Sequence, residues 1–421
     1  MEQKQVKILS WDEIEKKPPK ELKLSPMAQI PHKSRAYRTL LDLSHEVKEG
    51  NKVIARSVNE STVPLAPEKA LMQMGSAMPR IIIAMAQCPE DSVICFSKFD
   101  ISDGFWRIIN QLGKEYSFAF VMPTTPDEPI QIVVPSSVQM GWVDAPAYFS
   151  GASETARDVA AEYAEAPIGA LPEHRLEKKT ELSAAQAAEM NAANQSSAVP
   201  SDGQKQPSAH ERARMRLHYL LEVFIDDFIA AARAKSPEEL KHISRALLHA
   251  IHDVFPEGVH SPEDQPISVK KMDKGEAQWD VVKEVLGWIC DGKEKTICLP
   301  AEKVDKIVKA LKEMLRCKAG TPFEEFRQLM GKLYHASIGI PAGKGFMTPL
   351  NHQLAKGSKK VWFRKGSLQQ EVVQLWIALL HDAMTKPTRA RELLPASPDN
   401  VGLKDASCDG AGESGLVAIK R

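Results

Sequence analysis

Two groups of aspartates stand inside apolar runs, and they constrain the fold more than any other feature of this sequence. Asp100 ends one run in CFSKFDISDGFWRI, and Asp226 and Asp227 separate two runs in LEVFIDDFIAAA. Buried carboxylates are costly, and neighbouring like charges add to the cost unless a cation compensates them. A pair of hard divalent ions bridged by aspartate oxygens would do so, as in in-line phosphoryl transfer. The competing interpretation is that Asp226 and Asp227 form only the exposed tip of a hairpin turn.

The pattern of apolar residues predicts both helices and strands. Residues 217–232 carry two apolar runs around a tight polar pair, which favours a buried β-hairpin, with a helix as the alternative. Helices are expected at 237–255 and 300–318, where apolar residues recur at helical spacing. Asp144 followed by Pro146 is typical of a helix start. This irregular mixture favours an α+β fold over a wound parallel sheet.

Composition excludes several classes of protein. The 421 residues predict two or three domains, and 55 basic against 55 acidic residues exclude a uniformly basic nucleic-acid coat, although not a local basic stripe. The six cysteines form no C-x-x-C pair, which argues against a zinc ribbon or a disulfide framework. The sequence has no long apolar segment and a polar N-terminus, so we expect an intracellular protein without a signal peptide, a transmembrane segment or a membrane partner.

The composition changes sharply between about residues 165 and 214. This stretch has almost no large apolar residue and is rich in Ala, Gln, Ser, Asn and Pro. It offers too little apolar surface to offset the entropy of ordering it, which predicts a disordered surface insertion. Residues 1–30 are charged and carry several prolines, which predicts an extended lead-in.

Seven segments resemble, in the same order, motifs of reverse transcriptases, most closely those of gypsy-like LTR retrotransposons and retroviruses. The segments are PHKSRAYRTLLDLS (31–44), FDISDGFWRI (99–108), MGWVDAPAYF (140–149), FIDDF (224–228), VLGWICDG (285–292), FRQLMGKLYHASIGIP (326–341) and LKDASCDGAG (403–412). The resemblance implies a right-hand polymerase with fingers, palm and thumb and a truncated ribonuclease H-like C-terminal segment. In that family FIDDF stands where a Tyr-x-Asp-Asp hairpin is usual, so Phe224 replaces the tyrosine.

The same resemblance implies domains and an activity. Fingers and palm would occupy 31–290, interrupted by the insertion; the thumb would occupy 291–350, and 351–421 would hold a connection and the start of the ribonuclease H-like domain. The protein would be an RNA-directed DNA polymerase, a nucleotidyltransferase encoded within a retrotransposon polyprotein. Its partners would be an RNA or DNA template with a primer and deoxynucleoside triphosphates, and its cofactor two Mg²⁺ ions, with Mn²⁺ as a substitute. Asp405 alone represents the ribonuclease H acidic set, so ribonuclease H activity is not expected from this chain.

Site residues follow from the resemblance, position by position. The catalytic carboxylates would be Asp100, Asp226 and Asp227, and the metal ligands Asp100, Asp226 and the carbonyl of Ile101. Residues expected to contact the incoming nucleotide, with Phe105 beneath its sugar, are Arg38, Lys33, Phe105, Met140 and Gly141. Residues expected to hold the primer are Leu286, Gly287 and Trp288. The general acid for pyrophosphate would be Lys270 or Lys271, with a solvated charge run as the alternative.

Two other functions fit parts of the same sequence. A viral RNA-dependent RNA polymerase would share the palm, but such enzymes select the ribose hydroxyl with polar residues, whereas Phe105 is bulky and apolar. A non-enzymatic, domesticated remnant that only binds nucleic acid is the other alternative, against which the intact aspartates argue. Met140 occupies the place of a retroviral glutamine, a position that varies among gypsy-like elements.

Overall fold

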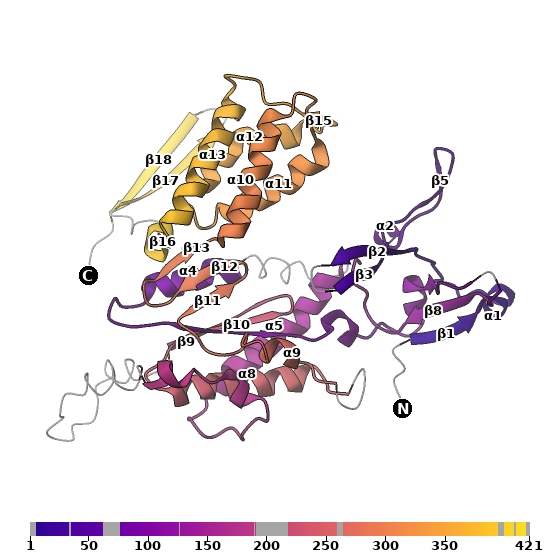
Figure 1. The fold of residues 1–421 in the computed structure, drawn as a ribbon, viewed down its shortest axis with the longest axis horizontal. Coiled ribbons are helices and arrows are strands. Elements are labelled where there is room, and N and C mark those ends of the chain that lie inside the picture. Colours follow the sequence, from indigo (N-terminus) through magenta and orange to yellow (C-terminus); the bar gives the residue numbers. More distant parts are fainter. Residues whose placement is uncertain are drawn as a thin grey trace. The chain divides into compact units, whose positions relative to one another are not determined.

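The computed structural model describes residues 6–32, 35–61, 76–125, 127–188, 190, 218–258, 264–394, 400–407 and 410–417, with the backbone alone at 30–32, 35–39 and 400–417. The chain divides into two compact units: unit 1 is Met1–Met78 with Cys95–Asp280, and unit 2 is Pro79–Ile94 with Val281–Arg421. Both units contain helices and strands (Figure 1), so the predicted α+β class is confirmed. Lys33 and residues 191–214 of the expected insertion lie outside the described residues.

The core of unit 1 is a three-stranded antiparallel sheet in the order β6-β10-β9. Its strands are β6 (Cys95–Asp100), β9 (His218–Phe224) and β10 (Asp227–Arg233). β9 and β10 form the predicted hairpin, in which Phe224 pairs with Asp227. The side chains of Phe96, Phe99 and Phe228 are at most 1% exposed, so both apolar runs beside the aspartates are buried as their composition requires.

Two long helices pack alongside each other in unit 1 (Figure 1): α5 (Ala145–Ala164), which also contacts β9, and α8 (Pro237–Val254). α8 begins where the Ser236 side chain accepts a hydrogen bond from the Glu239 N–H, followed by proline in the first turn. α5 begins after Asp144, as predicted, although the Asp144 side chain makes no capping hydrogen bond. Small residues on α5, among them Ala156 and Ala160, are fully buried and allow the helices to approach closely.

The N-terminal residues fold into unit 1, so the expected extended lead-in is only partly correct. β1 (Val6–Ser10) pairs with β8 (Gln131–Pro135), which pairs with β7 (Phe120–Val121). α1 (Trp11–Lys16) starts with a capping box between Ser10 and Glu13. The reason is local burial: Ile14 packs with Ile132 and Val134 in a small separate core.

The remaining elements of unit 1 are short. Two hairpins are formed by β2 (Met27–His32) with β3 (Arg35–Leu41) and by β4 (Val47–Glu49) with β5 (Lys52–Ala55). The short helices are α2 (Val58–Ser61), α9 (Val269–Met272), η1 (Gly104–Arg107), η2 (Glu115–Phe118) and η3 (Glu177–Thr180).

The described part of the expected insertion, residues 165–188, is packed rather than disordered. Leu176, Glu177 and Thr180 are buried. The Thr180 carbonyl accepts a hydrogen bond from the Trp279 N–H at 3.1 Å, and the Gln186 amide donates to the Asp280 carboxylate at 2.8 Å. The prediction of disorder from composition is wrong for these residues, because hydrogen bonds to Trp279 and Asp280 fix the segment although it has little apolar area.

A buried ion pair joins this segment to α8. The Glu177 carboxylate accepts hydrogen bonds from Arg245 Nε at 2.7 Å and Nη2 at 3.0 Å, and from the His174 N–H at 3.1 Å. Lys241 Nζ lies 3.1 Å from the same carboxylate. Burial raises the pKa of Glu177, but the hydrogen bonds from Arg245, the His174 N–H and Lys241 outweigh it and lower the pKa to about 2.

Replacing Glu177 with glutamine is expected to lower the free energy of unfolding by about 3 kcal/mol at pH 7, because each pKa unit corresponds to about 1.4 kcal/mol. The folded-state pKa is depressed, so this stability is present above the unfolded pKa near 4.5 and is lost as the pH falls towards 2. Urea unfolding at pH 7 and pH 3 measures the loss in the free energy of unfolding that Glu177→Gln causes. Glu181→Gln is the control, since the Glu181 side chain is 53% exposed. An equal loss at the two pH values would contradict the assignment.

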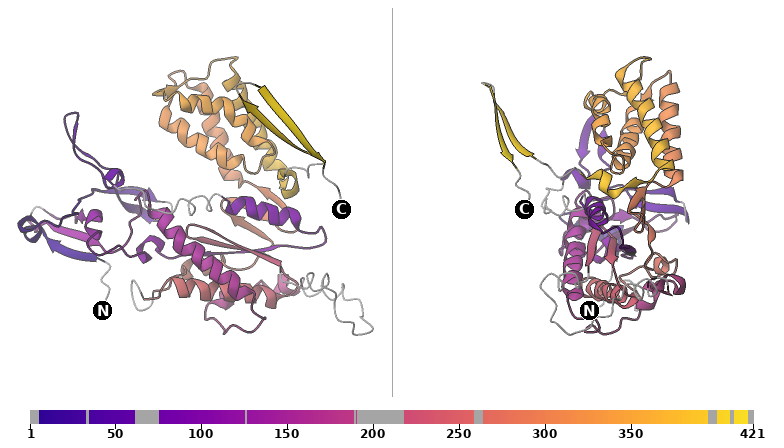
Figure 2. Two further views of the ribbon diagram at one scale, coloured as in Figure 1. Left: turned by 180° about the vertical axis from the view of Figure 1, so that it is seen from behind. Right: turned by 90° about the vertical axis from the view of Figure 1, so that its left-hand side faces the viewer.

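Unit 2 is built around a four-stranded sheet and four helices. The sheet has the order β11-β12-β13-β16, from β11 (Val282–Val285), β12 (Trp288–Asp291), β13 (Thr296–Cys298) and β16 (Thr388–Arg389). The helices, seen from behind in Figure 2, are α10 (Ala301–Arg316), α11 (Phe323–Ala336), α12 (Thr348–Ala355) and α13 (Leu368–Thr385). They pack on one another through buried side chains such as Leu311, Leu329, Leu350 and Trp376.

Unit 2 also contains α4 (Ala77–Gln87, from Pro79 onward), two short ribbons and two 3-10 helices. The ribbons are β14 (Thr321–Pro322) with β15 (Lys360–Val361) and β17 (Asn400–Ser407) with β18 (Gly410–Val417); the 3-10 helices are η4 (Gly343–Met347) and η5 (Ala390–Leu393). The helices predicted at 237–255 and 300–318 are confirmed as α8 and α10. Among the helices in the described residues, none has the length and apolar character needed to cross a membrane.

Candidate active site

The ends of β6 and the β9–β10 hairpin bring the three predicted aspartates together. Asp227, the first residue of β10, lies directly opposite Asp100, the last residue of β6. Asp226 and Ile225 form the two-residue turn of the hairpin, and the Asp226 carbonyl accepts a hydrogen bond from the Ile101 N–H at 3.0 Å. The register therefore joins residues more than a hundred positions apart, with Asp227 across from Asp100 and Asp226 at the exposed tip.

Unusual backbone geometry occurs in three of the predicted motifs. Ile225, beside the paired aspartates, has a φ of 57°, in the left-handed region that β-branched residues rarely adopt. Asp103 in the first motif and Leu286 in the VLGW segment also have positive φ, at 50° and 48°. Such conformations cost free energy and persist where the surrounding structure enforces them, often at functional sites.

The site combines partly buried carboxylates with two lysines. Asp100 is 8% exposed, and burial raises its pKa to about 6, with Asp226 and Asp227 adding to the increase and Lys271 opposing it. Burial also raises the pKa of Asp227, where Lys98 acts in the opposite direction. Asp100 is thus compensated by direct contact with Lys271, and Asp227 by the charge of Lys98, which itself pairs with Glu276 at 2.9 Å. The cluster favours cations at this edge of the sheet.

Lys271 contacts the aspartate cluster directly, because its ammonium group donates a hydrogen bond to the Asp100 carboxylate. α9, which begins after Ser268, carries it there, and the Ser268 N–H donates to the Asp100 carbonyl at 2.8 Å. The Lys271 pKa is raised: burial lowers it, but the hydrogen bond and charge of Asp100 outweigh this effect. Of the two lysines considered for proton donation, Lys271 reaches the aspartates and Lys270 is exposed.

The aspartates suit a hard divalent cation by their chemistry, because such ions take carboxylate and carbonyl oxygens. In the described residues, however, no three His, Cys, Asp or Glu side chains are grouped closely enough to hold a metal. The Lys271 ammonium group occupies the Asp100 carboxylate instead. A metal at this position therefore requires Lys271 to release Asp100.

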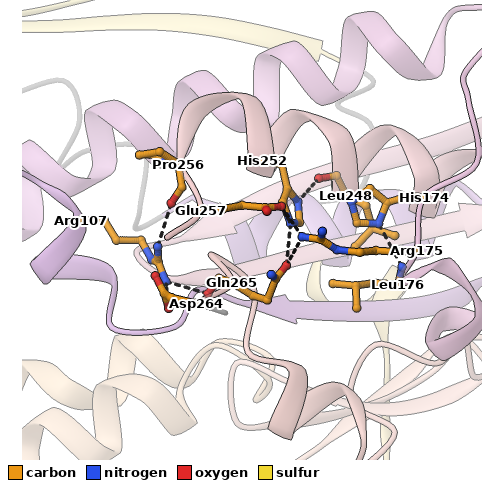
Figure 3. A network of polar contacts seen from close by, with 10 residues as sticks. All are labelled: Arg107, His174, Arg175, Leu176, Leu248, His252, Pro256, Glu257, Asp264 and Gln265. Carbon is orange, nitrogen blue, oxygen red and sulfur yellow. Dashed lines mark hydrogen bonds and ion pairs between the residues drawn. The ribbon is translucent and has the colours of Figure 1, made fainter. Parts of the chain in front are cut away.

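Sequence reasoning missed Arg107, whose side chain bonds the chain just after Asp100 to a later segment; Figure 3 shows its contacts with Pro256, Asp264 and Gln265. Its side chain is fully buried and donates to the Ser102 carbonyl at 2.7 Å, to the Pro256 and Gln265 carbonyls at 3.0 and 2.7 Å, and to the Asp264 carboxylate at 2.9 Å. These bonds tie the chain after β6 to the segment that leads into α9. The available signal was an arginine within the apolar FWRII sequence, since a buried guanidinium group needs several acceptors.

The same network continues to a group of histidines (Figure 3). Arg175 contacts Glu257 and Gln265, and His252 Nδ1 lies 2.7 Å from the Leu248 carbonyl. The ring of His174 lies 4.7 Å from that of His252, between ring centres. Burial and the neighbouring histidines and Arg175 lower the pKa of His174 to about 4. These contacts join residues 174 and 175 to α8 and to Glu257 and Gln265 within unit 1.

The predicted nucleotide-contacting residues are placed in part. Phe105 is half-buried against Phe149, with ring centres 5.3 Å apart. Gly141 has a φ of 100°, and a Cβ atom there would lie 3.3 Å from the Leu41 carbonyl at the end of β3, so the close approach predicted for this glycine is to the protein's own backbone. Met140 is 42% exposed. Arg38 lies in β3 opposite Ile30, and Lys33 lies outside the described residues.

The predicted primer-holding residues lie in unit 2, in the turn between β11 and β12. Leu286 and Gly287 form this two-residue turn, with φ values of 48° and 81°. Lys303 Nζ donates to the Gly287 carbonyl at 3.1 Å and to Glu284 at 2.9 Å. Trp288 is only 2% exposed and its ring faces Gly339, where a Cβ would lie 2.3 Å away.

The Trp288 ring belongs to the core of unit 2, and the expected contact of Leu286, Gly287 and Trp288 with a primer stays a prediction. Leu286 and Gly287 remain partly accessible at the turn. Asp405, the proposed ribonuclease H remnant, lies in β17 opposite Gly412, and only its backbone is described.

Among known proteins, similarity to this chain was found only with solved structures. No family model matches the sequence, and neither does any curated protein. Similar structures are of foamy viral protease-reverse transcriptase: the dRH form with double-stranded DNA (TM-score 0.48, 13% identity), the protein with double-stranded DNA (0.47, 15%) and the protein with an RNA/DNA hybrid (0.46, 14%). Each alignment covers 97% of this chain. It covers 53%, 65% and 42% of the three solved chains, in the order given. The chain thus spans about half the length of the first structure.

Proposed function

We propose that this protein is an RNA-directed DNA polymerase that adds deoxynucleotides to a primer 3′-hydroxyl. One observation carries the proposal: the antiparallel register of β6 and β10 sets Asp100 opposite Asp227, with Asp226 in the adjoining turn. Carboxylates gathered from two separate motifs at one sheet edge are an arrangement suited to two-metal phosphoryl transfer. The order of the seven motifs supports the same function.

Asp100, Asp226 and the Ile101 carbonyl would hold the two Mg²⁺ ions, for which Mn²⁺ is a possible substitute, and Asp227 would add negative charge beside them. When bound, these ions activate the attacking hydroxyl and neutralise charge on the transferred phosphate. The protein contributes orientation, because Asp100 is fixed by the backbone bonds of Ser268 and Ile101 on either side of it.

Lys271 has a second role in this proposal. In the reaction, the primer oxygen forms a bond to the α-phosphorus, the bond from that phosphorus to pyrophosphate breaks, and the hydroxyl proton passes to water. Lys271 is protonated at neutral pH, as its raised pKa requires, and holds its proton next to Asp100. Once it releases Asp100, its ammonium group is available to donate a proton to the departing pyrophosphate.

Other residues would bind the substrates. Phe105 would lie under the nucleotide sugar, and Arg38 would contact the triphosphate with its guanidinium group. Exposed basic residues of α10 give a face suited to a template–primer backbone, since the apolar residues of that helix are buried on its other side: Lys306, Lys309, Lys312 and Arg316.

A protein that binds nucleic acid without polymerising is the second candidate, and one observation favours it. The Lys271 ammonium group compensates Asp100 directly, so the cluster has a cation without any metal. A remnant that had lost catalysis while keeping its fold would retain such a contact. In an enzyme, Lys271 must instead release the Asp100 carboxylate so that a metal ion can bind it.

A nucleotide-choice assay separates these functions. The protein is incubated with one primed RNA template and Mg²⁺, with either deoxynucleotides or ribonucleotides. We expect extension with deoxynucleotides at far higher efficiency. Equal or preferred use of ribonucleotides would identify an RNA polymerase instead, and tight template–primer binding without extension in Mg²⁺ or Mn²⁺ would identify the binding protein.

A further inference from the structure

A single exposed tryptophan distinguishes one end of unit 2. Trp362 is 54% exposed, whereas Trp279, Trp288 and Trp376 are at most 2% exposed and the other three are partly buried. Exposed indole rings are uncommon because they leave a large apolar surface in water. Trp362 follows directly after β15, at the ribbon that β15 forms with β14.

The Trp362 ring is held in place on the backbone of Gly320. A Cβ atom at Gly320 would lie 2.5 Å from Trp362 Cε2 and 2.6 Å from Nε1, so the ring lies directly against this glycine. Gly320 also has a φ of 81°. The turn is braced by bonds from Lys360 Nζ to the Ala319 carbonyl at 3.2 Å and from the Phe323 N–H to the Lys359 carbonyl at 3.1 Å. The indole is thus fixed at the surface.

Basic residues surround this ring in the sequence and in the ribbon. The stretches 317–323 and 356–366 contain no acidic residue and six exposed basic residues: Lys318, Lys356, Lys359, Lys360, Arg364 and Lys365. In the described part of the chain, none of the six forms an ion pair with a carboxylate. The nearest acidic residues in the sequence are Glu324 and Glu325, and Glu324 pairs with Arg327 at 2.7 Å. Six basic residues without an ion pair in the described part of the chain give this surface an excess of positive charge.

We propose that Trp362 and these basic residues form a binding site for single-stranded nucleic acid. A base would stack on the accessible part of the indole, and Arg364 and Lys365 would contact the flanking phosphates. Paired bases are stacked inside a duplex and present no free face, so a single strand is the partner that uses both the ring and the charge. The site uses no residue of the aspartate cluster.

Tryptophan fluorescence tests this site in the full chain. A dT oligomer of about a dozen nucleotides is titrated in EDTA without nucleotides, which prevents polymerisation. We expect the emission of Trp362, obtained as the difference between wild type and Trp362→Phe, to be quenched on binding. Trp362→Ala is expected to weaken binding about tenfold, and Trp362→Phe, which keeps an aromatic ring, about threefold or less.

Charge is tested by the salt dependence of the same titration. Arg364→Gln with Lys365→Gln is expected to reduce the slope of log affinity against log salt by about 1.4, or about 0.7 for each lost phosphate contact. Lys17→Gln with Lys293→Gln is the matched control, since both lysines are exposed, and should leave the slope unchanged.

Two results would overturn the proposed site. One is an unchanged dT affinity in Trp362→Ala; the other is equal quenching of Trp362 by polyphosphate, which has no bases and would indicate a general anion surface. The assay is independent of catalysis. Quenching in a protein that fails to extend primers would reject only the polymerase, and extension without quenching would reject only this site.

Discussion

Replacing Asp226 with asparagine is expected to reduce nucleotide incorporation about a thousandfold, equivalent to roughly 4 kcal/mol of activation free energy. The amide keeps the shape of the carboxylate but loses the charge that would hold a cation. Asp226 lies exposed in the hairpin turn, so its replacement removes no core packing. We therefore expect the free energy of unfolding to change by less than about 0.5 kcal/mol.

The experiment compares single-nucleotide incorporation, template–primer binding by fluorescence anisotropy, and urea unfolding. Asp158→Asn is the control, because Asp158 is an aspartate of the same unit whose side chain is 69% exposed on α5. It should match the wild type in all three measurements. Activity of Asp226→Asn within tenfold of wild type would show that this carboxylate does not hold a catalytic metal.

Replacing Phe105 with valine is expected to raise the use of ribonucleotides relative to deoxynucleotides about a hundredfold. An aromatic ring beneath the sugar leaves no room for a 2′-hydroxyl and offers it no acceptor, so truncating the ring removes the clash. Phe105 is half-buried and its main aromatic contact is Phe149, which stays in place. Deoxynucleotide efficiency should fall less than ribonucleotide efficiency rises.

The measurement is kcat/KM for dGTP and GTP on one primed template, in wild type and variant. Trp106→Phe is the control, because Trp106 is the neighbouring aromatic residue in η1 and has no assigned role in sugar choice. If wild type strongly prefers dGTP and Phe105→Val keeps the same ratio, sugar selection lies elsewhere and the assigned role of Phe105 is wrong.

Local patterns predicted the elements that carry the site. The two apolar runs around Asp226 and Asp227 are long enough for strands and are separated by a tight turn, and they form β9 and β10. α8 and α10 followed from apolar residues at helical spacing. These features depend on neighbours in the sequence, which is why periodicity is sufficient to find them.

Long-range features of the site were not predictable in this way. The pairing of Asp227, rather than Asp226, with Asp100 depends on the turn at Ile225, where a β-branched residue adopts positive φ. The contact between Lys271 and Asp100 depends on a four-residue helix far along the chain. Burial of Arg107 requires acceptors from three separate segments, which no local pattern encodes.

The segment at 165–188 illustrates the same principle for the fold. Its composition predicts disorder because hydrophobic burial is the usual source of stability. Glu177 instead forms ion pairs with Arg245 and Lys241, which lie on a helix more than sixty residues later in the sequence. Composition alone does not report such pairs.

Copying of a defined RNA sequence tests the central claim most directly. The wild-type protein is given a mixed-sequence RNA template, a DNA primer, all four deoxynucleotides and Mg²⁺, and the extended strand is sequenced. We predict a DNA product complementary to the template, dependent on the metal and abolished by EDTA. Absence of any extension with either Mg²⁺ or Mn²⁺, in protein that binds the same template–primer, would contradict the claim.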